Sequence, residues 1–183
     1  MYKKELRKIY KQKRKELTEN QIKGFQKSIY SQVLNSDFSQ TKSIHIFLPI
    51  ENQKEINTYP IIQFLREQDK QIIISKSCFK TSTLSHFVFD DNIVLEINKY
   101  GIPEPVNAKE FDVKEIDLVF VPMLVSDQLN YRVGYGKGFY DRFLSDCKQN
   151  IKTIGLNFFA PIPKIKDVDS FDIALDEVIY PLT

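Results

Sequence analysis

Short apolar runs that alternate with helical patterns are the feature that most constrains the fold of this chain. Three such runs are Ser43–Leu48, Gln71–Ser75 and Ile116–Val121, each of a length that suits one buried strand. A helical pattern over Thr58–Gln68, with Pro60 in its first turn, separates the first two runs. Apolar strands that are joined through helices are typical of a parallel sheet covered on both faces.

The rest of the chain extends this alternation. Residues 1–17 repeat apolar side chains at helical spacing, on a face formed by Tyr2, Leu6, Ile9, Tyr10 and Leu17. Thr18 and Gln21 have the spacing of a capping box that opens a second helix. Further along, the pattern predicts a short strand over 87–89, which can pair in antiparallel fashion, and a rigid loop over 101–105. It also predicts a helix over 139–148 and strands over 151–156 and 177–180.

Length and composition point to one globular domain. A chain of 183 residues suffices for one layered core, so a single domain over residues 1–183 is expected. The formal net charge of +2 gives no argument for a nucleic-acid partner. No apolar stretch follows the basic start and no run is long enough to span a membrane, so a cytoplasmic protein with no membrane partner is expected. Cys78 and Cys147 share no ligand spacing with His45 or His86, which argues against a zinc site.

The segment 132–141, with the sequence RVGYGKGFYD, carries the strongest functional signal. Glycine recurs at alternate positions in it: Gly134, Gly136 and Gly138. Alternating glycines let the backbone curl tightly and approach a ligand, and the N–H groups of such a curl form a concavity for anions. The following helix adds the positive potential of its first turn. Arg132 and Lys137 supply cations that suit phosphate oxygens, so a phosphate-binding loop is predicted.

Neither standard phosphate motif fits this segment. The dinucleotide-binding pattern needs glycine where the chain has Phe139, and the P-loop pattern needs Ser or Thr where the chain has Gly138. A glycine-rich surface turn capped by a helix is therefore the competing interpretation. Asp141 is equally open to two interpretations. An acid in the first turn of a helix is stabilised by the helix dipole, and a carboxylate there can also hold Mg²⁺ against phosphates.

The basic N-terminal helix admits three interpretations. Its stripe consists of Lys4, Arg7, Lys11 and Arg14, with Lys3 and Lys8 on the flanks. The stripe can be a solvated face, or a surface for a nucleic acid or a membrane, although no aromatic residue is interleaved with it. In the third interpretation Lys3, Arg7 and Arg14 fold back onto the phosphates bound by Arg132, because Lys3 and Arg7 are one helical turn apart.

Acids elsewhere in the chain complete the set of candidates. Glu55 follows the strand over 43–48 and is expected at a carboxyl end of the sheet, where ligands of open α/β sheets bind. A surface glutamate near a helix start is the plainer alternative. Asp172 and Asp176 would ordinarily be turn or surface acids. His45 alternates with apolar neighbours, which favours a core or edge position.

Five blocks in a fixed order resemble the 5-formyltetrahydrofolate cyclo-ligase family, also called methenyltetrahydrofolate synthetases. They are Lys3–Arg7 followed by Arg14, Glu55–Thr58, Gly101–Pro105, Arg132–Leu144 and Asp172–Val178. The blocks cover essentially the whole chain. Their shared order makes the resemblance far more specific than the glycine segment alone.

The resemblance implies a fold and a reaction. The fold is a single-domain, three-layer α/β fold of Rossmann-like type with a mostly parallel central sheet, related to the CoA-transferase-like group. The reaction turns 5-formyltetrahydrofolate and ATP into 5,10-methenyltetrahydrofolate, ADP and phosphate, with Mg²⁺. ATP phosphorylates the formyl oxygen, N10 of the folate attacks the activated carbon, and phosphate leaves as the ring closes. The expected enzyme is a monomer that acts on a small molecule and binds no nucleic acid.

The resemblance also implies roles for individual residues. Lys137, Arg132 and Tyr135 are the expected catalytic residues, and Asp141 and Asp172 are the expected Mg²⁺ ligands. The ATP-binding set comprises Lys3, Lys4, Arg7, Arg14, Arg132, Val133, Gly134, Tyr135, Gly136, Lys137, Gly138, Phe139 and Tyr140. The folate-binding set comprises Ile50, Glu55, Tyr135, Gly136, Lys137, Gly138 and Phe139. In this scheme the Glu55 carboxylate accepts paired N–H bonds from the pterin.

Two departures from the family pattern affect these roles. The stretch Pro49–Lys54 is longer than the family usually shows, which weakens Ile50 as a folate contact and makes Glu51 a rival of Glu55. Phe139 stands where tyrosine is commoner, so one hydroxyl is lost. A relative that binds both ligands without activity is a further alternative, and the retained Lys137 argues against it.

Overall fold

The computed structural model describes residues 1–182. The helices are α1 (Lys3–Glu16), α2 (Glu19–Leu34), α3 (Tyr59–Glu67) and α4 (Phe139–Asp146), with short 3₁₀ turns at Glu51–Gln53 and Val113–Glu115. The strands are β1 (Ser43–His45), β2 (Gln71–Cys78), β3 (Thr83–Val88), β4 (Val94–Ile97), β5 (Pro103–Val106), β6 (Leu118–Pro122), β7 (Val125–Ser126), β8 (Arg132–Val133), β9 (Lys152–Leu156) and β10 (Glu177–Ile179).

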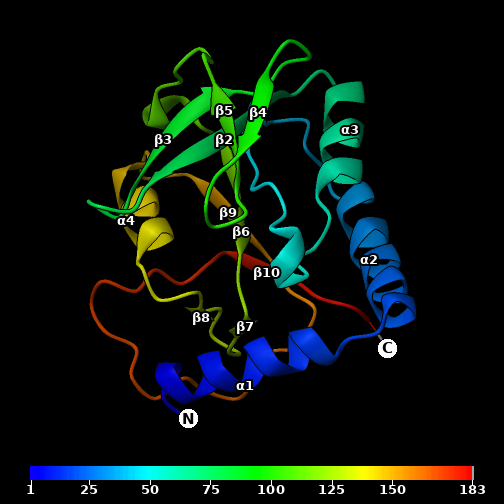
Figure 1. The fold of residues 1–183 in the computed structure, drawn as a ribbon, viewed down its shortest axis with the longest axis vertical. Helices are drawn as coiled ribbons and strands as arrows, with labels where there is room; N and C mark the ends of the chain where they lie inside the picture. The colour runs from blue at the N-terminus through cyan, green and yellow to red at the C-terminus, as the bar shows by residue number, and fades with distance from the viewer. Residues whose placement is uncertain (183) are drawn as a thin grey trace.

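A six-stranded sheet with the order β10-β9-β6-β1-β2-β3 forms the centre of the molecule. Neighbouring strands in it run parallel, except that β3 runs antiparallel to β2. Figure 1 shows α2 and α3 on one side of the sheet and α4 on the other. The sequence prediction of a three-layer α/β fold with a mostly parallel sheet is therefore confirmed.

The central strand β6 explains why the sheet is covered on both faces. Leu118 and Phe120 pack in the cluster that includes α2 and α3, while Val119 and Val121 pack in the cluster that includes Phe143 of α4. Successive side chains of a strand point to opposite faces, so an uninterrupted apolar run needs a helix layer on each side.

Helix α1 lies outside these layers, beside β7 and β8 at one end of the sheet (Figure 1). Leu6 and Tyr10 are buried and pack in a cluster with Val133 of β8. Tyr2 is 54% exposed, so the apolar face predicted for this helix is not buried at its N-terminal end. Arg14 is only 5% exposed, so the basic stripe is not one uniformly solvated face.

The sequence prediction of a rigid loop over 101–105 is also wrong in part. Residues 103–106 form β5, which pairs in antiparallel fashion with β4. Pro103 and Pro105 are two residues apart, so both of their nitrogens point to the same edge of the strand, away from the β4 ladder. The strand β4 and the β7–β8 hairpin were not predicted, because strands of two to four residues leave almost no periodic signal.

Other boundaries also differ from the sequence prediction. The strand predicted over 87–89 is the antiparallel β3, but it begins at Thr83 and ends at Val88. β1 ends at His45, although the chain stays buried through Leu48. β2 extends to Cys78 and carries its polar residues toward the carboxyl end of the sheet. None of the helices within residues 1–182 is long and apolar enough to cross a membrane.

Gly155 in the middle of β9 gives a test of the central packing. A Cβ atom at this position would overlap Met123 Cε and lie 2.8 Å from Leu175 Cδ1. Gly155→Ala is therefore expected to lower the free energy of unfolding by about 1–3 kcal/mol, because buried side chains must move to admit the methyl group. Denaturant unfolding measures the change.

Gly24→Ala is the matched control for this substitution. Gly24 lies within α2 and nothing is within 4 Å of an added Cβ atom. The same methyl group should raise the free energy of unfolding there by roughly 0.5–1 kcal/mol, since glycine weakens a helix interior. Similar effects of the two substitutions would show that the space around Gly155 is not restricted.

Candidate active site

A cavity of about 710 Å³ opens where the parallel strands end, between α1, the glycine segment 132–141 and the loop after β1. Its volume suits a small-molecule ligand. The predicted site residues line it, with two exceptions, Lys4 and Arg14. Lys4 is exposed on the outside of α1, and Arg14 is buried next to the cavity. Glu55 belongs to the lining and its sequence rival Glu51 does not.

The glycine segment adopts a backbone conformation that side chains disfavour. Gly136 has a φ of 93° and Gly138, the N-cap of α4, has a φ of 69°. A Cβ atom at Gly136 would lie 2.9 Å from Cζ of Arg7, so the Arg7 guanidinium packs directly against the loop. Nothing lies within 4 Å of an added Cβ atom at Gly134, which leaves its backbone open to a ligand.

Arg7 and Arg14 of α1 both reach the glycine segment, by different routes. The Nε atom of Arg7 donates a hydrogen bond to the carbonyl of Gly134 at 3.0 Å. Arg14 donates from Nη1 to the Tyr135 hydroxyl at 3.0 Å and from Nη2 to the carbonyl of Met123. Arg7 therefore remains at the surface of the cavity, while Arg14 supports the loop from within.

Glu55 completes a buried network with Arg14 and Tyr135. The Tyr135 hydroxyl donates to Oε1 of Glu55 at 2.7 Å, and the N–H of Ile50 donates to Oε2 at 2.9 Å. Nη1 of Arg14 lies 4.0 Å from the same Oε1, and the side chains of Arg14 and Glu55 are 6% and 5% exposed. Burial raises the pKa of Glu55, although the Tyr135 hydrogen bond and the Arg14 charge favour its ionised form. Burial also raises the pKa of Tyr135, which keeps its hydroxyl protonated.

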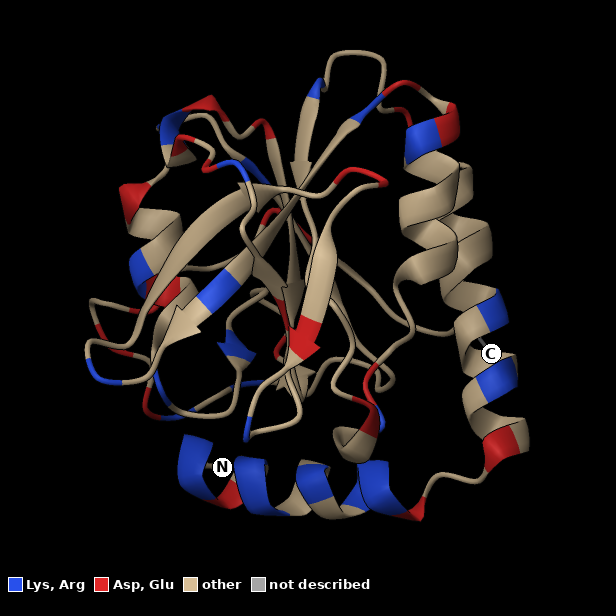
Figure 2. Cartoon of the chain, turned by 45° about the horizontal axis from the view of Figure 1, so that its top comes forward, with Lys and Arg blue, Asp and Glu red and all other residues tan. Residues whose placement is uncertain are grey.

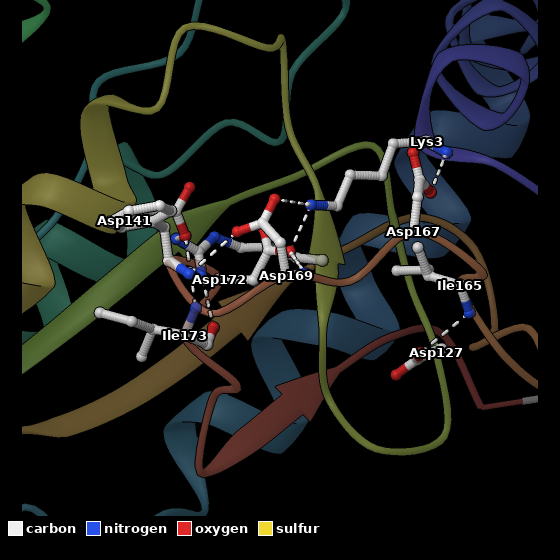
Figure 3. Close-up of polar contacts among 10 residues, drawn as sticks. Lys3, Asp127, Asp141, Ile165, Asp167, Asp169, Asp172 and Ile173 are labelled. Carbon is white, nitrogen blue, oxygen red and sulfur yellow. Dashed lines mark hydrogen bonds and ion pairs between the residues drawn. The ribbon is translucent and has the colours of Figure 1, made fainter.

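Two ion pairs join the predicted metal ligands to the predicted phosphate-binding cations (Figure 3). Nη2 of Arg132 lies 2.6 Å from Oδ1 of Asp141, and Nη1 of Arg132 donates to the carbonyl of Ile173 at 2.7 Å. Lys3 Nζ forms an ion pair with Oδ2 of Asp172. Burial lowers the pKa of Arg132, while the charges of Asp141 and Asp172 act in the opposite direction. These contacts hold the two cations at fixed positions in the cavity wall.

Lys137 differs from these paired cations. It is exposed at the mouth of the cavity, and its ammonium group makes no hydrogen bond or ion pair within residues 1–182. An unpaired ammonium on a mobile side chain is suited to neutralise charge on a bound anion. Figure 2 shows further Lys and Arg residues along α1, so the potential near this end of the molecule is positive.

Several residues that line the cavity were not predicted from the sequence. The additional residues include Lys11, Phe47, Ser75, Ser77, Phe79 and Tyr100. Phe79 and Tyr100 stack with a centroid distance of 4.0 Å, although they lie in different loops. The polar ending of β2 at Ser75 and Ser77 was the one available signal, because ligands bind beyond the carboxyl ends of parallel strands.

The buried Glu55 carboxyl gives a pH-dependent test of the network. Its pKa is raised in the folded state, so folding favours the protonated form, and this contribution is lost as the pH rises through the folded-state pKa. Glu55→Gln removes the buried charge, and its amide oxygen can still accept the Ile50 N–H bond. Without ligand, the variant should be more stable than the wild type at pH 7, and the difference should shrink as the pH falls toward 4.5, the ordinary glutamate value.

Denaturant unfolding at several pH values measures this difference. Glu51→Gln is the control, because Glu51 is exposed and lies outside the cavity lining. This control should change stability little at any pH. A stability difference between Glu55→Gln and the wild type that stayed constant with pH would contradict the assignment of a raised pKa.

Comparison with known proteins places the chain among folate enzymes. A family model described as the 5-formyltetrahydrofolate cyclo-ligase family matches residues 1–181. A mouse protein named 5-formyltetrahydrofolate cyclo-ligase is 30% identical over 162 residues, which cover 81% of this chain and 77% of the mouse protein. A Haemophilus influenzae protein of the same name is 27% identical over 180 residues, which cover 96% of this chain and 93% of that protein.

Solved structures agree with this assignment. The 5,10-methenyltetrahydrofolate synthetase of Aquifex aeolicus matches with a TM-score of 0.80 at 26% identity, over 97% of this chain and 89% of that chain. The synthetase of Mycoplasma pneumoniae matches in fold, with a TM-score of 0.76 at 21% identity, over 98% of this chain and 99% of that chain. With a family match along nearly its full length, the chain belongs to the 5-formyltetrahydrofolate cyclo-ligase family.

Proposed function

We propose that this protein converts 5-formyltetrahydrofolate and ATP into 5,10-methenyltetrahydrofolate, ADP and phosphate. One observation carries the proposal: residues from α1, from the loop after β1, from the glycine segment and from the loop before β10 meet in a single cavity. Ile102 and Pro103 also line the cavity, so all five blocks on which the family resemblance rests contribute to it. The family is named for this activity.

In this proposal the ATP phosphates lie against the glycine segment and the cations around it. The open backbone at Gly134 and the guanidinium of Arg7 form one side of the phosphate site. Lys3 and Arg132 form another side, and each is oriented by a carboxylate partner. Cations that are already oriented lose little conformational freedom when the phosphates bind, which favours both affinity and alignment.

The donor set near these cations fits a magnesium ion that arrives on the nucleotide. Asp141 and Asp172 both line the cavity. Mg²⁺ commonly takes one or two carboxylates and completes its octahedron with phosphate oxygens and water. Each ion pair uses one oxygen of its carboxylate, Oδ1 of Asp141 and Oδ2 of Asp172, so the other oxygen of each could hold the metal while Arg132 and Lys3 keep their positions. A metal held there would supply positive charge that neutralises the phosphates.

The folate lies on the Glu55 side of the cavity in this proposal. Each oxygen of Glu55 already accepts one hydrogen bond, from Tyr135 or from the Ile50 N–H. A carboxylate oxygen has a second lone pair, so both oxygens can also accept paired N–H bonds from a pterin. Arg14 and Tyr135 then act as positioning residues that fix the direction of the carboxylate.

The chemical step needs alignment more than a protein nucleophile. The terminal phosphoryl group of ATP is transferred to the formyl oxygen, which makes that oxygen a good leaving group. N10 then attacks the formyl carbon, and phosphate departs as the new ring closes. Phosphoryl transfer depends mainly on positioning and charge neutralisation, and the unpaired Lys137 is suited to contact the transferred group. The cytoplasmic location and the monomeric state expected from the sequence stay predictions.

A direct assay tests the reaction. Purified protein mixed with 5-formyltetrahydrofolate, ATP and Mg²⁺ should produce the near-ultraviolet absorbance of the conjugated methenyl product, and omission of ATP should abolish it. Absence of this absorbance after long incubation, with other nucleotides also tried, would overturn the proposed function.

A second experiment tests the role of Lys137. Lys137→Ala should lower kcat/KM by about 10²–10³-fold, the usual effect of removing one group that stabilises transition-state charge. Lys164→Ala is the matched control, because Lys164 is exposed and lies outside the cavity lining. Equal kinetic constants for the two variants would rule out a catalytic contact by Lys137.

A further inference from the structure

Ser75 and His45 form a hydrogen-bonded pair at the wall of the cavity. Ser75 is the fifth of the eight residues of β2 and belongs to the lining. Its Oγ atom is 2.7 Å from Nε2 of His45, which ends β1. His45 pairs with Ile73 in the sheet, two residues before Ser75, so both polar side chains face the α4 side. His45 is completely buried, and a polar pair is unusual on this mostly apolar face of the sheet.

The packing around His45 fixes its ring. The ring centroid lies 4.6 Å from that of Phe143 and 5.4 Å from that of His86, which is the cross-strand neighbour of Ser75. Burial holds the pKa of His45 well below its ordinary value, so the imidazole is neutral and only one ring nitrogen carries a proton. The ring can therefore neither rotate freely nor change its charge.

The unpaired ring nitrogen decides which tautomer is present. Nδ1 of His45 is buried and has no hydrogen-bond partner within residues 1–182. A proton on Nδ1 would create a buried N–H group without an acceptor, which is more costly than a lone pair without a donor. The proton therefore resides on Nε2, and His45 donates to Oγ of Ser75. Because Oγ accepts this bond, the hydroxyl proton of Ser75 is free to point into the cavity.

The surroundings of Ser75 indicate which part of the ligand it meets. The segment that follows β1 stays beside β2, because the N–H of Ile46 donates to the carbonyl of Ile73 at 2.9 Å, and it leads to Ile50, whose N–H holds Oε2 of Glu55. Ser75 thus lies on the Glu55 side of the cavity, where the folate is placed in the proposed function. Ser75 is not positioned as a nucleophile, because His45 has no carboxylate on Nδ1 within the described residues and is a weak base.

We propose that Ser75, oriented by His45, donates a hydrogen bond to an acceptor atom of the bound folate and contributes to its recognition. This assignment rests on the proposed function for the identity of the ligand. It makes Ser75 a binding residue and His45 a positioning residue. Both lie outside the five blocks that carry the family resemblance, so neither was singled out as a site residue from the sequence.

Calorimetric titration with 5-formyltetrahydrofolate tests the binding role directly. Ser75→Ala should raise the dissociation constant and the KM for folate about three- to tenfold, the range for loss of one neutral hydrogen bond, with kcat almost unchanged. Ser85→Ala is the matched control, since Ser85 is exposed on the neighbouring strand and outside the cavity lining. An unchanged dissociation constant for Ser75→Ala, or a fall in kcat alone, overturns the proposal.

A double-mutant cycle separates positioning from general destabilisation. His45→Phe replaces the ring inside an aromatic cluster and should weaken folate binding to a similar degree as Ser75→Ala. In the Ser75→Ala background it should cause no further loss, because the hydroxyl that it orients is gone. Losses that add fully in the double variant would assign His45 a purely structural role. If His45→Phe does not fold, Ser75→Ala alone decides the proposal.

The same titration distinguishes this inference from the proposed function. A wild-type protein that forms methenyl product while Ser75→Ala binds folate normally overturns the Ser75 assignment alone. A wild-type protein that binds folate without forming product overturns the proposed reaction, and the comparison of dissociation constants still decides the role of Ser75. A wild-type protein that does not bind folate overturns both.

Discussion

The buried contact of Arg14 with Tyr135 is the interaction on which the cavity depends. It connects α1 to the glycine segment and, through the Tyr135 hydroxyl, to Glu55 after β1. These three segments are far apart in the chain, and their meeting forms the buried side of the site. A guanidinium that is 5% exposed carries a large desolvation cost, which the Met123 carbonyl and the Tyr135 hydroxyl offset. Nε of Arg14 has no hydrogen-bond partner within residues 1–182, so the two Nη bonds carry this compensation and fix where α1 meets the glycine segment.

Two other cations of the cavity wall, Arg132 and Lys3, are also compensated by polar partners. Arg132 is as buried as a core residue and is held by Asp141 and by a carbonyl of the loop before β10. Lys3 is held by Asp172 from that same loop. Such pairs keep these cations in place without a ligand, so that their positions are set before a ligand binds. Lys137 is exposed and needs no such compensation, which leaves it available to a bound anion.

The fold was largely predictable from the sequence, because apolar runs of strand length such as Ile116–Val121 alternate with helical patterns along the chain. The β7–β8 hairpin and β5 were not, since their residues owe their conformation to tertiary contacts rather than to local pattern. The same division applies to the site. The glycine segment has a local signature, whereas Ser75 becomes noticeable only when β1 places the imidazole of His45 beside it.

Helix α1 illustrates why a charge pattern alone did not decide between a solvated face and a ligand site. Lys4, Lys8 and Lys15 are exposed, as expected for a solvated face. Arg7 and Arg14 lie on the side of the helix that meets the glycine segment, and the two arginines make hydrogen bonds there that a lysine would not reproduce with the same geometry. The exposed lysines maintain a positive potential around the site, whereas the two arginines, together with Lys3 and Lys11, belong to the cavity or to its support. A helix that served only to attract a polyanion would not need to bury one of its cations beneath a tyrosine.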